Sequence, residues 1–282
     1  LSFITGIDGK EYPMPSYETI VQRLAEQKEF LETKADQGFH KLLLVPFGMS
    51  LDELILKFRA HLLEYKKAYD QAHEKDTPPH IFSLDESQPV WVWESGYHGA
   101  DTNGTLVYDP VSFDGSHAGA TKADILAHQE VDKDASAGWR VLLLQEDEST
   151  KGYKGIPRSG NGQIVGAQHP RPDIEAGQSP REYLASQLAA SSEVDSPFQG
   201  EHGMTPEEWI VLFMAHLEQT GKPIDDYQSG TEAIAYLTGA YFTASGVVPY
   251  AYWYRDGRQV YVFRRGPDLV GERIGVRSAV RV

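Results

Sequence analysis

Apolar residues in the first 75 positions of the chain are spaced for two helices with one strand between them. After Ser16, a residue type that caps helices, apolar residues recur at roughly helical spacing. Residues 41–45 form a short apolar run that ends at a proline, which predicts a buried strand. Ser50, with Glu53 three residues later, forms the pattern of a capping box and predicts a second amphipathic helix. Together these segments predict a helix–strand–helix unit over residues 1–75.

The pattern changes after a polar segment that holds Pro78 and Pro79 and indicates a linker. From residue 85 onward, short apolar runs bounded by turn-forming residues predict strands at 90–93, 106–108, 139–144, 233–237, 251–254, 259–264 and 275–282. Helices are predicted at 121–129, 180–190 and 205–220. A glycine-rich stretch predicts a long loop insertion near 146–180. We therefore expect an α+β protein with the N-terminal unit at 1–75 and a second domain at 85–282.

The composition narrows the classes of function. The 282 residues include 41 acidic and 26 basic side chains, a net charge of −15, so the surface as a whole should repel nucleic acid and anionic lipid. Cysteine is absent, which excludes disulfides, thiolate catalysis and iron–sulfur clusters. No apolar stretch approaches the length of a membrane-spanning helix, so we expect no membrane insertion. No signal peptide is visible, and the compartment stays open between cytoplasm, phage particle and cell surface.

The segment from residue 250 onward differs from the rest of the chain in charge and composition. It carries seven arginines against three acidic residues, a local net charge of +4, and is rich in aromatic residues. Tyr, Trp and Arg are the residues that most often anchor binding interfaces. The alternative is that alternate aromatic residues of each strand fill the core while the arginines lie in water. The candidate ligand-binding residues are Tyr250, Tyr252, Trp253, Tyr254, Arg255, Asp256, Arg258, Arg264, Arg265 and Asp268.

Several short motifs in the same part of the chain occur in the order of a known fold. They are Glu208-Trp209 near the start of a predicted helix, Trp253 in a late strand and Gly275-Val-Arg277 in the closing strand. This order resembles the C-type-lectin-like fold shared by formylglycine-generating-enzyme-type domains and the variable proteins of diversity-generating retroelements. The resemblance covers residues 200–282 well and extends less closely back to about residue 85.

Several functional motifs of that family are missing from this chain, and their absence indicates which of the family's activities it lacks. The oxidase members use cysteines, the sulfoxide synthases have a His-x3-His-x-Glu pattern, and calcium-dependent lectins have a Trp-Asn-Asp motif; all three are absent here. The resemblance then implies a non-catalytic protein that displays a ligand-binding face on its C-terminal strands. A retroelement-diversified variable protein is one specific form of it. Its altered residues would lie among Tyr250 to Arg258 and Arg264 to Asp268.

Two weaker patterns concern metal ions. Asp101, Asn103 and Asp109 surround a glycine as the oxygen ligands of a calcium loop do, although a turn between two strands explains the same residues. A metal-dependent hydrolase with its site among His98, Asp101, Asp109 and His117 is an alternative function, because imidazole and carboxylate suit zinc or iron. No glutamate closes the calcium loop, and the spacing of the histidines matches no recognised metal motif. We therefore expect no cofactor and keep calcium as the weaker alternative.

Three further features complete the expectations. His216 lies on the apolar face of its helix and should be a hydrogen-bonded core residue. The glycine-rich loop at 152–166 has the composition of a phosphate cradle but lacks a strand–loop–helix frame, so a surface excursion is expected. A structural or phage-particle protein, assembled through Arg264 and Arg265, is a third hypothesis for the function. The ligand, the partner and the oligomeric state are not specified by the sequence.

Overall fold

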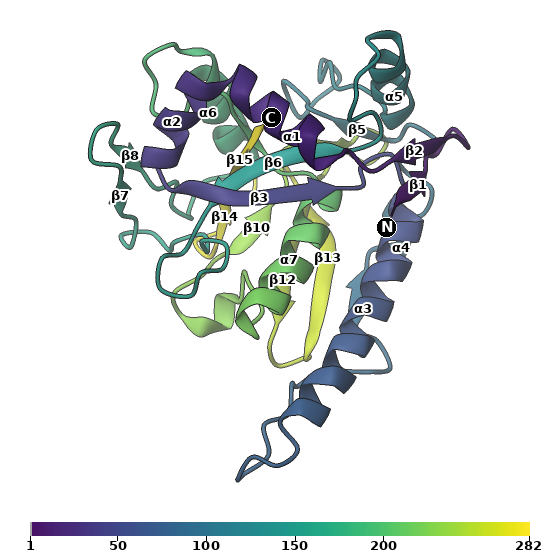
Figure 1. The fold of residues 1–282 in the computed structure, drawn as a ribbon, viewed down its shortest axis with the longest axis vertical. Coiled ribbons are helices and arrows are strands. Elements are labelled where there is room, and N and C mark those ends of the chain that lie inside the picture. The colour runs from purple at the N-terminus through teal and green to yellow at the C-terminus, as the bar shows by residue number, and fades with distance from the viewer. Residues whose placement is uncertain (1) are drawn as a thin grey trace.

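The computed structural model describes residues 2–282, and the predicted α+β class is confirmed (Figure 1). The larger sheet contains, in spatial order, β14 (Ile274–Val276), β10 (Ile234–Tyr236), β12 (Val248–Tyr254), β13 (Gln259–Arg265) and β4 (Val90–Val92). The outer pairs β10–β14 and β13–β4 are parallel, and the central pairs are antiparallel. The hairpin of β12 and β13 therefore lies inside the sheet, with β4 beside it.

A second sheet joins the two ends of the chain. Its strands, in spatial order, are β3 (Phe39–Val45), β6 (Arg140–Gln145), β15 (Ser278–Arg281) and β9 (Glu201–Gly203), and every pair is antiparallel. Two-stranded ladders complete the strands: β1 (Phe3–Thr5) with β2 (Glu11–Pro13), β5 (Leu106–Tyr108) with β11 (Ala240–Phe242), and β7 (Ile164–Val165) with β8 (Arg171–Pro172). The second sheet thus places a strand from the first 45 residues against strands from the middle and the end.

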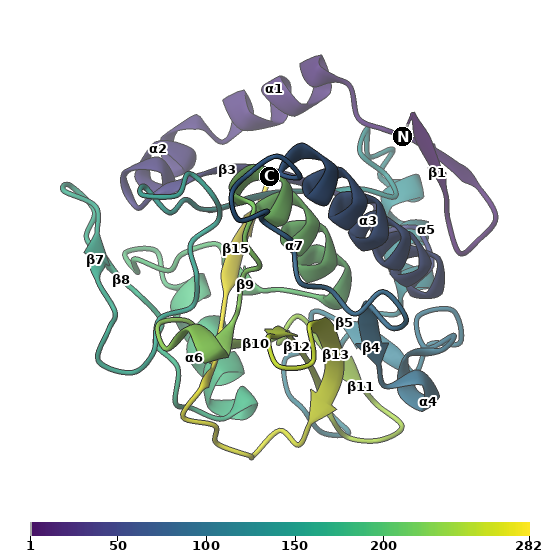
Figure 2. The same cartoon turned by 90° about the horizontal axis from the view of Figure 1, so that it is seen from below.

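The helices lie on both sides of these sheets (Figure 2). They are α1 (Tyr17–Glu26), α2 (Lys28–Asp36), α3 (Leu51–Ala72), α4 (Glu94–Tyr97), α5 (Lys122–Val131), α6 (Pro180–Ser192) and α7 (Pro206–Thr220), with a 3-10 turn η1 (Tyr227–Ser229). Figure 2 shows α3 and α7 side by side, and the two helices are in contact. Helix α7 begins with a complete capping box, because the Thr205 hydroxyl accepts from the Glu208 amide and the Glu208 carboxylate accepts from the Thr205 amide.

One hydrophobic core crosses the expected boundary near residues 75–85. Leu43 of β3 and Phe58 of α3 belong to the same buried cluster as Phe213 of α7 and Trp253 of β12. Phe58 and Phe213 meet edge to face with ring centroids 5.6 Å apart. The expected linker is anchored as well, since Phe82 is buried and its amide donates to the Asp70 carboxylate. The helix–strand–helix unit and the rest of the chain therefore share one core.

The elements differ from the sequence-based expectation in several respects. The strands β1, β2, β7, β8, β9 and β11 and the helix α4 have no predicted counterpart, and three predicted features are altered. The first predicted helix is interrupted at Gln27, whose backbone leaves the helical region between α1 and α2. The predicted closing strand is two strands, β14 and β15, which enter different sheets on either side of Arg277. The Ser50 hydroxyl caps α3 through the Glu53 amide, whereas the Glu53 carboxylate pairs with Lys57. Within residues 2–282, no helix is both long and apolar enough to cross a membrane.

Candidate functional site

The alternation of side chains along β12 divides the candidate residues between two faces of the larger sheet. Tyr250, Tyr252 and Tyr254 point to one face and are half-buried, whereas Ala251 and Trp253 point to the other face and are buried. Trp253 is 4% exposed and its ring stacks on Phe82, 5.8 Å between centroids. The prediction that Trp253 is a ligand-binding residue is therefore wrong. Trp253 packs in the core, on the side of β12 that faces α7.

The outward face carries seven half-buried aromatic side chains, and we call this set the aromatic face. Its members come from β4, η1, β12 and β13: Trp91, Tyr227, Tyr250, Tyr252, Tyr254, Tyr261 and Phe263. Trp91, Tyr261 and Tyr252 are register partners on three adjacent strands. Trp91 and Tyr227 lie far from residue 250 in sequence, and strand pairing brings them to the hairpin. The alternating Val-Trp-Val pattern at 90–92 is the signal that identifies Trp91 as outward.

The rings of the aromatic face stack on one another. The centroids of Trp91 and Tyr261 are 5.1 Å apart with an interplanar angle of 22°, and those of Tyr261 and Tyr252 are 5.3 Å apart at 28°. Tyr250 and Tyr252 continue the series at 5.9 Å and 12°. Side chains on a strand stand roughly perpendicular to the sheet, so parallel neighbouring rings cover each other's faces and present their edges outward. Burial raises the pKa of Tyr252, so its hydroxyl stays protonated at neutral pH.

The charged candidates around this face are largely engaged within the protein. Arg255 donates to the Asp226 carboxylate at 2.5 Å, and the Arg264 guanidinium lies 4.7 Å from the ring centroid of Trp93. Asp268 pairs with Arg181 at 2.6 Å. Arg265 donates to the carbonyl of residue 270. Asp256 and Arg258, both exposed, flank the turn of the hairpin.

Beneath the hairpin, the motif residues meet at a buried carboxylate. One oxygen of Asp225 accepts from Arg277 Nη2 at 2.6 Å, and the other accepts from Trp209 Nε1 at 2.7 Å. The Asp225 carbonyl also accepts from the amide of Trp253 at 3.3 Å. This cluster fixes α7, β12 and the β14–β15 junction to one another. Burial raises the pKa of Asp225, and the nearby guanidinium of Arg277 opposes that shift.

The weak candidate metal ligands each make a different interaction within the protein. Asp101 binds the ammonium of Lys122 at 2.6 Å, whereas Asp109 pairs with Arg140 and Arg281. The Asn103 side chain accepts from the amide and hydroxyl of Thr105, which closes an ordinary turn. The weaker alternative, a calcium loop of Asp101, Asn103 and Asp109, is therefore not assembled.

The histidines of the alternative hydrolase site are also apart. His98 is exposed beside Asp52 at 3.1 Å, and His117 Nδ1 accepts from the Gly119 amide. In the part of the chain that the structure describes, no three metal-binding side chains converge. His216 is a hydrogen-bonded core residue as predicted: its Nδ1 accepts from the Tyr153 amide, and burial lowers the pKa of its imidazole to about 4.

The glycine-rich loop already holds an anion of its own. The amides of Gly160 and Gly162 donate to the two oxygens of the Glu175 carboxylate at 2.8 and 2.7 Å. Lys154 pairs with Asp173. An internal carboxylate thus occupies the position that a phosphate would take in such a loop.

The aromatic face offers apolar ring edges and hydroxyl groups. Such a surface binds a partner by burying apolar area and by hydrogen bonding. The Arg277–Asp225–Trp209 cluster below it holds the hairpin in place. No protein-family model, curated protein or solved structure matches this chain.

Proposed function

We propose that this protein is a non-catalytic binding protein that captures a partner through the aromatic face. The observation that carries the proposal is the placement of seven half-buried aromatic side chains on the outward face of the larger sheet. A contiguous apolar patch of this kind on a protein surface marks an interaction site. Tyr and Trp supply large contact areas at low cost in conformational entropy, and stacking already restricts these rings before binding.

The orientation of the rings favours a protein partner. Sugars and nucleobases bind aromatic side chains through the ring face, which requires that face to be open. Here Trp91, Tyr261 and Tyr252 cover each other's faces and offer edges and hydroxyls instead. Such groups suit hydrogen bonding and edge contacts to a polypeptide, as in antibody paratopes. Asp256 and Arg258 at the exposed turn would lie at the polar rim of the interface.

We also propose that the fold is of the C-type-lectin-like type. The motif residues that carry the resemblance support this proposal, because Trp209 and Arg277 bind the same carboxylate and Trp253 packs against α7 next to them. In a retroelement-diversified form, substitutions would fall on outward positions such as Tyr250 and Tyr252 and spare the inward Trp253. Sequencing the gene across the source population tests that form, and a pattern that includes inward positions would reject it.

Replacing both Tyr252 and Tyr261 with alanine should abolish capture of the partner. The partner would first be isolated by crosslinking to the wild-type protein, identified and purified, and its affinity then measured directly. Two central aromatic side chains are expected to contribute at least about 2 kcal/mol, a loss of about thirtyfold or more in affinity.

Tyr17→Ala is the matched control, because Tyr17 is an exposed tyrosine on α1, outside the aromatic face. It should leave the affinity unchanged, and thermal unfolding should show that both variants are folded. A partner that binds the folded double variant as tightly as the wild type would rule out the aromatic face as its site.

A further inference from the structure

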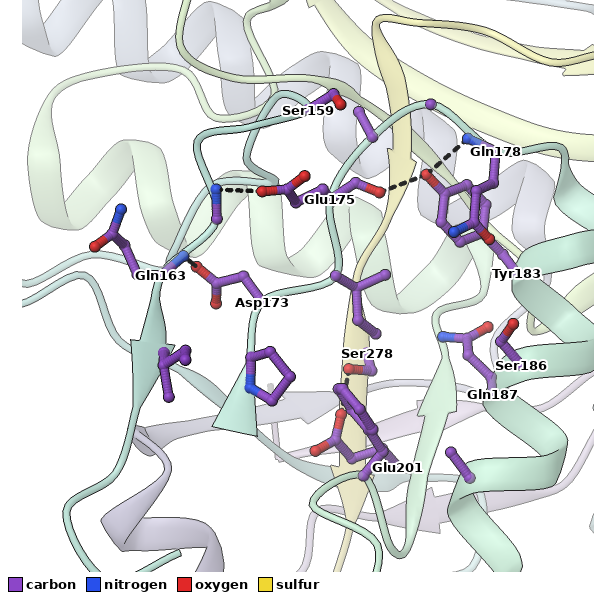
Figure 3. A pocket seen from close by; sticks show the side chains of 18 residues that line it. Ser159, Gln163, Asp173, Glu175, Gln178, Tyr183, Ser186, Gln187, Glu201 and Ser278 are labelled. Atoms are coloured by element: carbon purple, nitrogen blue, oxygen red, sulfur yellow. Dashed lines mark hydrogen bonds between the residues drawn. The ribbon is translucent and has the colours of Figure 1, made fainter. Parts of the chain in front are cut away.

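A cavity of about 650 Å³ lies between α6 and the loop insertion, and none of its described lining residues belongs to the aromatic face. Figure 3 shows Asp173 and Glu175 of the loop on one side and Ser186 and Gln187 of α6 on the other, with Glu201 and Ser278 between them. This volume is in the range of pockets that bind drug-sized organic molecules. The cavity is therefore large enough for a ligand of several fused or linked rings.

Apolar side chains form much of the cavity wall. Ile164 and Ile174 contribute from the loop insertion, Ala190 from α6 and Phe198 from the segment before β9. The loop wall is held in place by the carboxylate of Glu175, which accepts from two loop amides, and by Asp173, which accepts from Lys154 and from the amide of Gln163. The cavity is thus shaped by internal hydrogen bonds before any ligand binds.

One buried polar group in the wall lacks a partner. Gln187 is 8% exposed, and its Oε1 accepts from the Thr238 hydroxyl at 2.8 Å. Its Nε2 is buried and has no hydrogen-bond partner among the described residues. Figure 3 shows this amide at the cavity wall, beside Ser186. A buried donor without a partner costs free energy, which a ligand with a hydrogen-bond acceptor would recover.

The charges that face the cavity are acidic. Asp173, Glu175 and Glu201 line it, and none of the described lining residues is basic. Arg171 and Lys34 lie behind Glu201 and direct their donors at its carboxylate, 2.7 and 2.8 Å away. Lys154 likewise pairs with Asp173, whereas Glu175 accepts from backbone amides and keeps its negative charge. An anionic ligand would therefore meet the charge of Glu175 and find no basic donor among the described lining residues.

We propose that this cavity is a second binding site, for an uncharged or cationic organic molecule that has an apolar body and a hydrogen-bond acceptor for Gln187. The apolar wall would bury the body of the molecule, and the Gln187 amide would fix its orientation. This site is independent of the proposed partner binding at the aromatic face.

Two naphthalene dyes test the predicted ligand class by equilibrium dialysis against the full chain. Prodan is neutral and carries a ketone oxygen, whereas anilinonaphthalene sulfonate has a similar ring system and a negative charge. We expect prodan to bind at least about tenfold more tightly than the sulfonate. Absence of prodan binding, or equal binding of both dyes, would overturn the proposal.

Two tryptophan substitutions on α6 locate the site. Ser186→Trp places a large side chain in the cavity and should weaken prodan binding by at least about tenfold. Ala189→Trp is the matched control: Ala189 is exposed on the same helix outside the cavity, so binding should be unchanged. Equal effects of the two substitutions would place the dye elsewhere and reject the site.

Gln187→Leu tests the hydrogen bond separately from the shape of the cavity. It should weaken prodan binding by about three- to tenfold, with folding checked by thermal unfolding. Unchanged affinity in a folded Gln187→Leu variant would remove Gln187 from the site. The double alanine variant of Tyr252 and Tyr261 should bind prodan normally, so failure at one site is distinguishable from failure at the other.

Discussion

Arg277→Met should lower the free energy of unfolding by about 3–5 kcal/mol, because it leaves the buried carboxylate of Asp225 without its cation. The two side chains are 2.6 Å apart, and the Asp225 side chain is fully buried. Trp209 would still donate to the carboxylate, but one neutral hydrogen bond does not replace a paired charge. Urea unfolding of the wild type and the variant at the same pH measures the difference.

The loss should depend on pH. Burial already raises the pKa of Asp225, and removal of the guanidinium raises it further. A carboxyl group with a raised pKa in the folded state contributes stability below its unfolded pKa and loses that contribution as the pH rises through the folded value. The variant should therefore be closer to the wild type in acid than at pH values above neutrality.

Two further variants separate charge from packing. Arg273→Met alters an exposed arginine in the same segment and should change stability by no more than about 0.5 kcal/mol. Asp225→Asn combined with Arg277→Met removes both charges while keeping an acceptor for Trp209, and should be more stable than Arg277→Met alone. If the double variant were less stable than Arg277→Met, the unpaired charge would not be the cause of the loss.

Sequence periodicity predicted most elements because burial enforces it locally. The starts of α1, α3 and α7 follow capping residues that satisfy the first amides of each helix. The alternation of side chains along β12 also places Trp253 on the face opposite its tyrosine neighbours, as the alternative that alternate aromatic residues fill the core implies.

The residues that the sequence did not reveal are those brought together by long-range pairing. Asp225 lies in a turn, and only the folded chain places it against both Trp209 and Arg277. Trp91 joins Tyr261 through a parallel strand pair between distant segments. No pattern of neighbouring residues predicts either contact, because the number of residues between the two partners depends on the loops that connect their elements. The arginines of the tail illustrate the same point. Arg255, Arg264 and Arg277 contact Asp226, Trp93 and Asp225, and all three of these partners lie before residue 250.

Asp101, a weak candidate calcium ligand, does have a cation beside it, and that cation is the side chain of Lys122. The Lys122 ammonium lies 2.6 Å from the Asp101 carboxylate, 2.9 Å from the Glu207 carboxylate and 2.8 Å from the Met49 carbonyl oxygen. The side chains of Lys122, Asp101 and Glu207 are all fully buried. The ring of Phe47 lies 5.2 Å from the same nitrogen. The acidic residue beside the glycine-containing turn therefore belongs to a buried charge cluster. The sequence pattern does not show that the neutralising cation is a lysine side chain of the protein rather than a metal ion.

Lys122→Met should consequently destabilise the protein by about 3–5 kcal/mol, since it leaves two buried carboxylates without a cation. Lys133→Met, at an exposed position just after α5, is the matched control and should change stability by no more than about 0.5 kcal/mol.

Urea unfolding in calcium and in chelator should give the same wild-type stability, because the Lys122 ammonium holds the position that a metal cation would take. Clear stabilisation of the wild type by calcium would mean that the metal binds despite Lys122. Recovery of Lys122→Met by calcium would instead show that the two carboxylates require a cation at this position.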